Sequence, residues 1–529
     1  MNKPEQFSAD LKEKTPKYSI RFQSLGQEWL GNAKGLCVLL IISFALKISL
    51  FFMTDTISND GPVYINQAIK FLEGSWREAI EIDLTFLYPL LIAAFGRLGF
   101  DLVKAGQIVS LVSSVLVLVP LYLLFRGIFN ERVAFLGCLA LTLSPGMNKF
   151  AVAVMRDPFF LLVVAWLVYF AWRVMKEAKI RYFVAISILS VLSPILRVEG
   201  LLLVPIIFLM LLFKALSGKR SRKTLLIGAG LLFVLLAFVG LAVVPTTEFS
   251  FARHPRVQQI VYSVTKVKES GFFNYNHVLS EKLTDMELSI PGGPLNNNFA
   301  KISRNHIGLI YLLGLISLVA QVIWFPFLVV FLFGLPQLLV FGKNSIFLLF
   351  FILPYLFIAY LYNINFGFLE ERYLYVPVML MFLGVGIGLD RIFKLFTKLW
   401  FSRFSFLFFV IFFFFTPLVQ AVREEAKPEA ISSRLAGEWL ATQPELKESS
   451  LIANGRKIPF YAERGGNFVG GGFISISVLK ETAINNHIQV VAIEMRKSNL
   501  KYLPDFTGYS LLVKFEDPRY VALIYQKNP

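Results

Sequence analysis

Long apolar runs constrain this chain more than any other feature of its sequence. Segments 36–53, 105–125 and 225–244 carry almost no charge, and about 18 such residues are enough for one membrane-spanning helix. Hydrophobic residues make up 56% of the 529 residues, whereas a soluble globular chain contains about 45–50%. The sequence therefore predicts an α-helical polytopic membrane protein, for which lipid is the solvent over much of the surface.

The basic residues set the predicted orientation of the chain. The formal net charge is +17, but lysine and arginine fall in short clusters between apolar runs, which indicates cytoplasmic loops and not nucleic-acid binding. The firmest cluster, Lys219 to Lys223, contains no acid. With all such clusters inside, we expect about eleven spans, a cytoplasmic tail at 1–35 and an extracytoplasmic C-terminus.

The same parity argument divides the chain into regions. The predicted transmembrane domain covers 36–421, with the first apolar run retained as a span, and its outer loops are 54–104 and 246–305. Residues 182–213 have basic clusters on both sides, so we expect two half-length helices that cross outward and return at 193–200. Further spans are expected near 133–152, 158–172, 345–362, 373–390 and 404–421.

Residues 422–529 differ in character from the rest. The stretch 432–442 places apolar residues on one side of a helix. Four short runs have the composition of β-strands, namely 450–453, 488–493, 510–514 and 520–525. The sequence therefore predicts a small extracytoplasmic α/β domain of about a hundred residues, a common size for one domain.

Two acidic residues are candidates for catalysis because parity places both at the outer face. Asp60 could act as a general base toward an acceptor hydroxyl, although a solvated loop acid or an Asx turn is the simpler interpretation. Asp157 precedes Pro158, which predicts an ordinary helix start with Asp157 as N-cap. Its carboxylate could also hold a hydroxyl or a metal ion at the outer face. Asp55 is a weaker candidate.

Two arginines are candidates for anion binding. Arg197 and Glu199 lie at a Pro- and Gly-interrupted reversal inside apolar sequence, where ionisable residues are costly and often functional. They could neutralise each other as a buried pair, or Arg197 could contact a lipid phosphate, whose oxygens match its forked donors. Arg372, before a late span, has the same phosphate interpretation beside a plainer one as an interfacial anchor.

The order of these motifs resembles a known family. The motifs are Asp60-x3-Tyr64, Leu87–Tyr88–Pro89–Leu90–Leu91, Arg126 with Arg132, Asp157–Pro158–Phe159, Arg197-x-Glu199–Gly200 and Arg372–Tyr373. Together they resemble the GT-C superfamily of membrane glycosyltransferases, in particular the protein O-mannosyltransferase group (glycosyltransferase family 39) and the aminoarabinose transferases that modify lipid A. The likeness covers most of residues 36–400.

The resemblance implies a function and a set of roles. The superfamily moves a sugar from a polyprenyl-phosphate donor to an acceptor on the outer side, with inversion at the anomeric carbon. It implies that Asp60 and Asp157 are catalytic, and that substrate or donor phosphate is bound by Tyr64, Arg197, Glu199 and Arg372. A divalent metal ion near the two acids stays open, and no other cofactor is implied.

The sequence also departs from the family. Asn59 stands where many members carry a second acid beside the first, and the Trp-Trp-Asp signature of oligosaccharyltransferases is absent. The acceptor expected from the resemblance is a glycolipid or protein, and the setting is the cell envelope, in a plasma or bacterial inner membrane with periplasmic loops.

Two other functions remain open. A transporter or lipid flippase would explain the spans and their charges, although no inverted repeat is visible and the charges collect at one face, not at the midplane. A scaffold whose C-terminal domain binds a partner is the third hypothesis.

Overall fold

A computed structural model of the chain describes most of the helical region and most of the C-terminal domain. The described residues are 33–54, 56–177, 179–216, 230, 258, 265, 277–289, 301–340, 343–367, 369–398, 408, 411–425, 431–464 and 475–528. The predicted span at 225–245, most of the outer loop at 246–305, residues 1–32 and Asp55 lie outside them.

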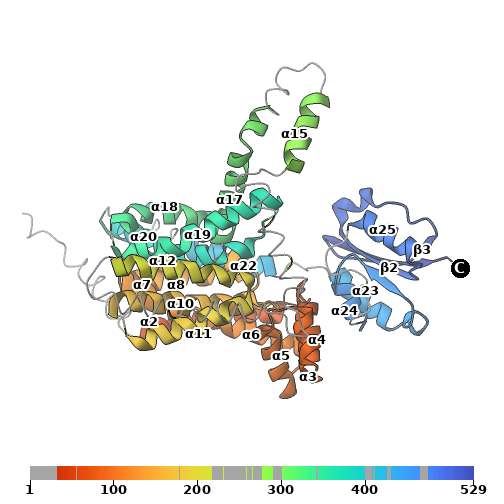
Figure 1. Ribbon diagram of the computed structural model, residues 1–529, viewed down its shortest axis with the longest axis horizontal. Helices are drawn as coiled ribbons and strands as arrows, with labels where there is room; N and C mark the ends of the chain where they lie inside the picture. Colours follow the sequence, from red (N-terminus) through yellow and green to blue (C-terminus); the bar gives the residue numbers. More distant parts are fainter. Residues whose placement is uncertain are drawn as a thin grey trace, which may run out of the picture.

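The described helices form an elongated bundle with a separate, smaller α/β domain beyond one end (Figure 1). In the described part of the chain, five helical segments are long and apolar enough to cross a membrane, or six if one bent pair is a single span. The chain is thus a multi-pass membrane protein, while the expected total of about eleven spans stays a prediction. The main helices of the bundle are α2 (Ala33–Met53), α6 (Leu102–Leu116), α7 (Leu118–Ile128), α8 (Glu131–Leu143), α10 (Asp157–Glu177), α11 (Ile180–Leu196), α12 (Leu203–Leu216), α17 (Ile307–Ile323), α18 (Phe325–Val340), α19 (Lys343–Phe366), α20 (Tyr375–Lys398) and α22 (Thr416–Glu425).

Helix α20 lies between α8 and α18 at backbone contact. A Cβ atom at Gly386 would clash with the carbonyl oxygen of Val133 on α8, and one at Gly388 with that of Val330 on α18. Small residues let membrane helices approach this closely, which increases their van der Waals contact. The glycines therefore fix the position of α20, whose N-terminal end carries a predicted site residue.

The predicted reversal in 182–213 is confirmed. Helix α11 ends at Leu196, a short 3-10 turn η1 covers Val198–Leu202, and α12 returns from Leu203. A side chain at Gly200 would clash with the backbone of Ser193 and Pro194. Only glycine fits this tight reversal, which holds the intervening Arg197 and Glu199 in place.

Two other segments break within apolar sequence. The predicted span at 133–152 is shorter, because α8 ends at Leu143 and a single turn, α9 (Pro145–Asn148), follows. Helices α17 and α18 meet at 102°, at Trp324, whose φ of 75° lies in the left-handed region.

The first outer loop folds into three helices at one end of the bundle, the end nearest the C-terminal domain (Figure 1). They are α3 (Gly61–Leu72), α4 (Trp76–Ile82) and α5 (Leu87–Arg97). The Gln67 amide ties α3 to α4 by donating to the carbonyl oxygens of Ala79 and Asp83, at 2.8 and 2.6 Å. Within the long predicted loop at 246–305, α15 (His277–Ser289) projects away from the bundle.

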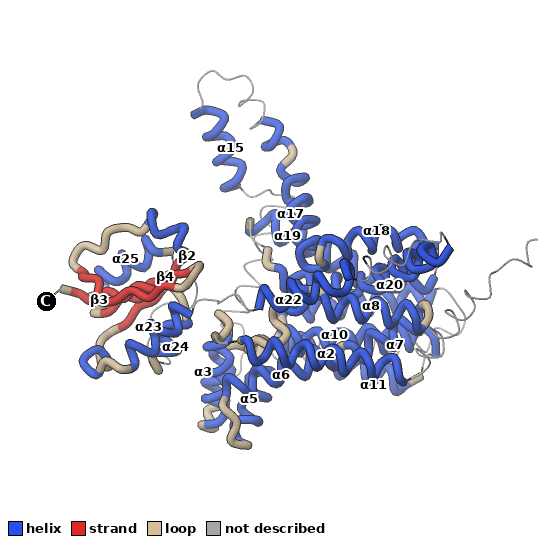
Figure 2. The backbone as a smooth tube through the Cα atoms, turned by 180° about the vertical axis from the view of Figure 1, so that it is seen from behind, coloured by secondary structure: helices blue, strands red, loops and turns tan. Residues whose placement is uncertain are grey.

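The C-terminal domain has a four-stranded sheet with helices packed against it (Figure 2). Strand order is β1-β2-β4-β3, in which β1 pairs parallel with β2 and the other pairs are antiparallel. The strands are β1 (Leu451–Ala453), β2 (Val490–Arg496), β3 (Tyr509–Glu516) and β4 (Tyr520–Lys527), and the helices are α23 (Ile431–Ala441), α24 (Lys457–Tyr461) and α25 (Ile476–Asn485). All four predicted strands and the predicted first helix are confirmed, whereas α24 and α25 were not predicted.

Candidate active site

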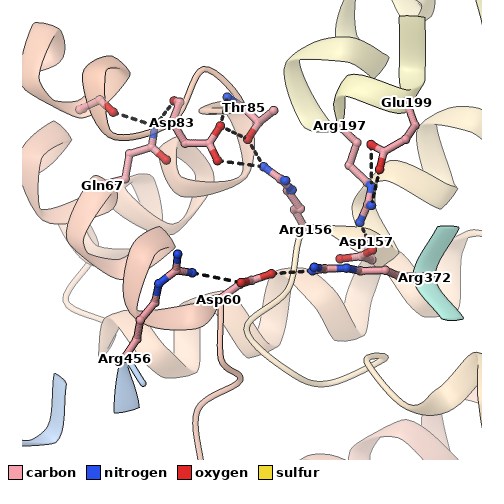
Figure 3. Close-up of polar contacts among 11 residues, drawn as sticks. Asp60, Gln67, Asp83, Thr85, Arg156, Asp157, Arg197, Glu199, Arg372 and Arg456 are labelled. Atoms are coloured by element: carbon pink, nitrogen blue, oxygen red, sulfur yellow. Dashed lines mark hydrogen bonds and ion pairs between the residues drawn. The ribbon is translucent and has the colours of Figure 1, made fainter. Parts of the chain in front are cut away.

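Asp60 lies between two arginines that come from distant parts of the chain. It precedes α3 at the N-cap position, but its side chain does not cap the helix. One carboxylate oxygen, Oδ2, accepts a hydrogen bond from Arg372 at 2.5 Å, and the other, Oδ1, accepts one from Arg456 at 3.2 Å (Figure 3). Asp60 is therefore neither a free solvated acid nor an Asx-turn residue.

The surroundings of Asp60 favour its ionised form. Burial on its own would raise the pKa of Asp60, but the charge of Arg372 and its hydrogen bond, with the charges of Arg456 and Arg156, hold that pKa below its usual range. The carboxylate is thus negatively charged at neutral pH. It is a weak proton acceptor while both guanidinium groups are bound to it.

Arg372 enters the site from the start of α20. It lies in the short turn η4 (Glu371–Leu374) before that helix, and it also forms an ion pair with Glu370. The neighbouring Glu371 pairs instead with Lys149 at 2.9 Å, which ties the turn to the loop after α9. Because α20 is fixed by its glycine contacts, Arg372 is a cation in a defined position.

Arg197, Asp157 and Glu199 form a triad in which Arg197 and Asp157 are buried and Glu199 is partly exposed. The Arg197 guanidinium donates to both carboxylate oxygens of Glu199, at 2.7 and 3.2 Å, and to Oδ1 of Asp157. Arg197 is 4% exposed and Asp157 is 2% exposed. A buried charge needs partners, and here one guanidinium serves two carboxylates. The expected Arg197–Glu199 pair is thus present, with Asp157 as its third member.

Asp157 does not play the helix-capping role that its sequence predicts. Helix α10 begins at Asp157 itself, one residue earlier than expected. Its carboxylate turns toward Arg197 (Figure 3), and the second oxygen, Oδ2, has no hydrogen-bond partner. Asp157 lines a small cavity together with Lys47, Thr142 and Tyr375.

Tyr64 lies one turn into α3 and is 2% exposed. Its ring meets that of Tyr88 edge to face, with centroids 5.4 Å apart, and the guanidinium of Arg156 lies 5.5 Å from its centroid. Tyr64 therefore packs against Tyr88 and the guanidinium of Arg156, one helical turn after Asp60.

Sequence reasoning missed Arg156 and Arg456. Arg156, 8% exposed, reaches from the start of α10 into the first outer loop, where it donates to Thr85 and to Asp83 (Figure 3). Its position beside Asp157–Pro158 gave a signal, since a buried arginine next to a candidate acid is costly unless it has a role. Arg456 follows Asp60 by 396 residues, and no local pattern points to it.

The acids of the site do not fit a metal ion as they are arranged. Both oxygens of Asp60 contact guanidinium groups, and Asp157 contacts Arg197. Among the described residues, no group of three or more His, Cys, Asp or Glu side chains could hold a metal ion. What the arrangement does offer is an ionised carboxylate for a proton and fixed cations for a developing negative charge.

Comparisons with known proteins agree with this architecture. Residues 83–243 match a family model described as dolichyl-phosphate-mannose-protein mannosyltransferase. The archaeal oligosaccharyltransferase AglB from Archaeoglobus fulgidus, in complex with an inhibitory peptide and a dolichol-phosphate, is 14% identical with a TM-score of 0.56, over 92% of this chain and 74% of that one.

ArnT from Cupriavidus metallidurans, bound to undecaprenyl phosphate, is 12% identical with a TM-score of 0.55, over 93% of this chain and 98% of that one. No curated protein gives a significant sequence match to the chain. At such low identities the common feature is the fold, which extends over nearly the whole chain.

Proposed function

We propose that the chain transfers a sugar from a polyprenyl-phosphate donor to an acceptor hydroxyl, as GT-C membrane glycosyltransferases do. Its fold matches those of AglB and ArnT, and residues 83–243 match the mannosyltransferase family model. One observation carries the proposal: the ionised carboxylate of Asp60 is held between the guanidinium groups of Arg372 and Arg456. A proton acceptor beside fixed cations is what displacement of a lipid phosphate by a hydroxyl requires.

In the proposed step, the acceptor oxygen forms a bond to the anomeric carbon on the face opposite the donor phosphate. The bond between that carbon and the phosphate oxygen breaks, and its electron pair leaves with the polyprenyl phosphate. The acceptor proton passes to the Asp60 carboxylate, which orients the hydroxyl before the reaction. Attack from the opposite face inverts the anomeric configuration.

The arginines have two different roles in this proposal. Arg372 stabilises the charge that develops on the leaving phosphate, because its forked donors match phosphate oxygens. Arg197 is already paired with Asp157 and Glu199, so we assign it a positioning role: it holds the reversal between α11 and α12 beside the site. We assign positioning roles also to Asp157, Glu199 and Tyr64.

The proposed reaction takes place on the extracytoplasmic face. The first outer loop helices and the C-terminal domain lie at the same end of the bundle (Figure 1), which is the end that the positive-inside rule assigns to the outside. The acceptor approaches from this end, and the polyprenyl tail lies between helices of the bundle.

The test compares the lipid and protein glycans of cells that carry the wild-type chain, Asp60→Asn or no protein, by mass spectrometry. We expect Asp60→Asn to remove the product without lowering the amount of protein in the membrane. The matched control is Asp101→Asn in the same loop, where the exposed Asp101 caps α6 by accepting a hydrogen bond from the Lys104 N–H at 2.9 Å. Asparagine can also cap a helix, so this variant should form product normally.

Two results would count against the proposal. Normal product from Asp60→Asn would remove that residue from the mechanism. Identical glycans with and without the protein, together with uptake of a solute or lipid into sealed vesicles, would instead identify a transporter or flippase.

A further inference from the structure

One arginine of the C-terminal domain reaches the site described above. Arg456 lies at the start of α24, directly after the loop that follows β1, and its guanidinium donates to Oδ1 of Asp60 (Figure 3). We propose that Arg456 is a donor-phosphate residue and that the C-terminal domain thereby completes the donor site. This inference rests on the proposed function and assigns that domain a direct part in it.

The loop that carries Arg456 is fixed by the sheet of its own domain. The Asn454 side chain accepts a hydrogen bond from the Glu494 N–H and donates one to the Glu494 carbonyl oxygen, both at 2.7 Å. One side chain thus extends the parallel pairing of β1 with β2 beyond the last strand residue. The loop that carries Arg456 is therefore fixed by hydrogen bonds within its own domain.

A second contact docks the same segment onto the membrane domain. The N–H of Ile57 donates a hydrogen bond to the hydroxyl of Tyr461 at 2.8 Å, and the side chains of Phe460 and Tyr461 pack against the core of the helical bundle. The two hydrogen bonds from this segment, to Ile57 and to Asp60, thus fall within four consecutive residues, 57–60. When the segment that carries Tyr461 is docked on the bundle, Arg456 lies beside Asp60, the proposed base.

The charges of the reaction explain why this arginine would serve a phosphate. Before transfer, Asp60 is negative and takes one guanidinium on each oxygen. As Asp60 accepts the acceptor proton it loses that charge, while the leaving phosphate gains one. The two guanidinium groups then bind the phosphate more strongly than the carboxyl group.

Arg456 is the arginine better placed to make this exchange. Its contact with Asp60 is 3.2 Å, compared with 2.5 Å for Arg372, and Arg372 precedes α20, which packs at backbone contact against α8 and α18. Arg456 is held beside the bundle by the segment that also carries the Tyr461 hydrogen bond. The exchange of partners therefore begins with Arg456.

The experiment measures binding of undecaprenyl phosphate, used as the probe, to the full chain in phosphatidylcholine nanodiscs. Arg456→Gln should weaken binding by about tenfold, the range of one charge-assisted hydrogen bond. Arg456→Lys keeps the charge without the fork and should lie between. The matched control is Arg434→Gln, in the same domain, where Arg434 forms an exposed pair with Glu438 at 2.7 Å; it should bind as the wild type does.

Two further variants separate the possible results. Tyr461→Phe removes the docking hydrogen bond and keeps the charge, so a loss as large as that of Arg456→Gln would assign the effect to docking and overturn the phosphate contact. If Arg372→Gln weakens binding while Arg456→Gln binds like Arg434→Gln, the inference fails and the proposed function stands. If neither variant weakens binding, the donor assignment of the proposed function fails as well.

Should Arg456→Gln not fold, Arg456→Lys decides the question alone. It keeps a positive charge opposite Asp60, so the domain contact is retained. Normal binding by that variant would then contradict a forked phosphate contact, and a loss of severalfold would support it.

Discussion

Lys47 donates a hydrogen bond from its ammonium group to the side-chain oxygen of Asn148 at 3.1 Å, inside the helical bundle. Lys47 is 4% exposed and Asn148 is 3% exposed, and the Asn148 amide donates in turn to the carbonyl oxygens of Thr142 and Ser144. The lysine charge thus depends on a polar turn that interrupts the chain after α8.

Removing that acceptor should destabilise the protein. In Asn148→Leu the buried Lys47 amine loses its hydrogen-bond partner, and we expect a cost of about 1–3 kcal/mol, as for other buried polar groups left unsatisfied. Thermal unfolding in detergent measures the effect. Adding Lys47→Met should recover part of the loss, since the charge is gone while the amide contacts stay absent. A double variant no more stable than Asn148→Leu would contradict this account.

The pH dependence of transfer should report on Arg372. Burial alone would raise the pKa of Asp60, and Arg372 is the largest opposing influence. The stability that the paired carboxylate contributes is present above its unfolded pKa and is lost as the pH falls through the lowered pKa of the folded protein.

In Arg372→Gln the opposing influence is gone, so the pKa of Asp60 rises and the acid limb of kcat/KM should move to higher pH. The rate itself should fall by about 10² to 10³, typical of a lost transition-state donor. Initial rates across the acid range give both values. Arg434→Gln should leave the limb in place; an unmoved limb in Arg372→Gln would separate Asp60 from the pH profile.

The glycines of α20 should be intolerant of even a methyl group. Gly386→Ala places a Cβ atom against the backbone of α8, and overpacking of this kind costs about 1–3 kcal/mol. The matched control is Gly314→Ala on α17, where the nearest atom to an added Cβ is 3.9 Å away. Unfolding temperatures of the two purified variants should differ clearly, and equal values would show that α8 and α20 can separate without cost.

Removing the charge of Arg197 should destabilise the protein more than replacing its guanidinium with an ammonium group. Arg197→Met leaves the carboxylates of Asp157 and Glu199 without their common partner, at a cost of about 3–5 kcal/mol. Arg197→Lys keeps the charge and should be intermediate, because one ammonium group cannot replace the fork to Glu199. Expression and thermal stability measure this order, and a methionine variant as stable as the wild type would refute the structural role of the triad.

Much of the architecture follows from local properties of the chain. Apolar length and basic clusters predict the reversal at Arg197–Glu199, because a segment flanked by basic clusters must return to its own side. Short runs with the composition of β-strands predict the four strands of the C-terminal domain. Helix α24, with five residues, is too short for its periodicity to be recognised.

The contacts of the site depend on tertiary structure and could be predicted only in part. Asp60 and Arg372 are expected on one face from the parity of the spans, but nothing local indicates that they pair. The capping prediction for Asp157 was wrong because Arg197, 40 residues further on, draws its carboxylate away from the helix end. Arg456 belongs to another domain, so its contact with Asp60 appears only once both are folded.

Backbone-to-backbone packing on two sides leaves α20 without a layer of side chains on which to slide. To admit a bulky lipid-linked sugar, parts other than α20 would have to move. The docked segment of the C-terminal domain is one such part. In the proposed function, a substrate entering the site would meet Arg372 at the start of the closely packed α20 and Arg456 on the docked segment of a separately folded domain.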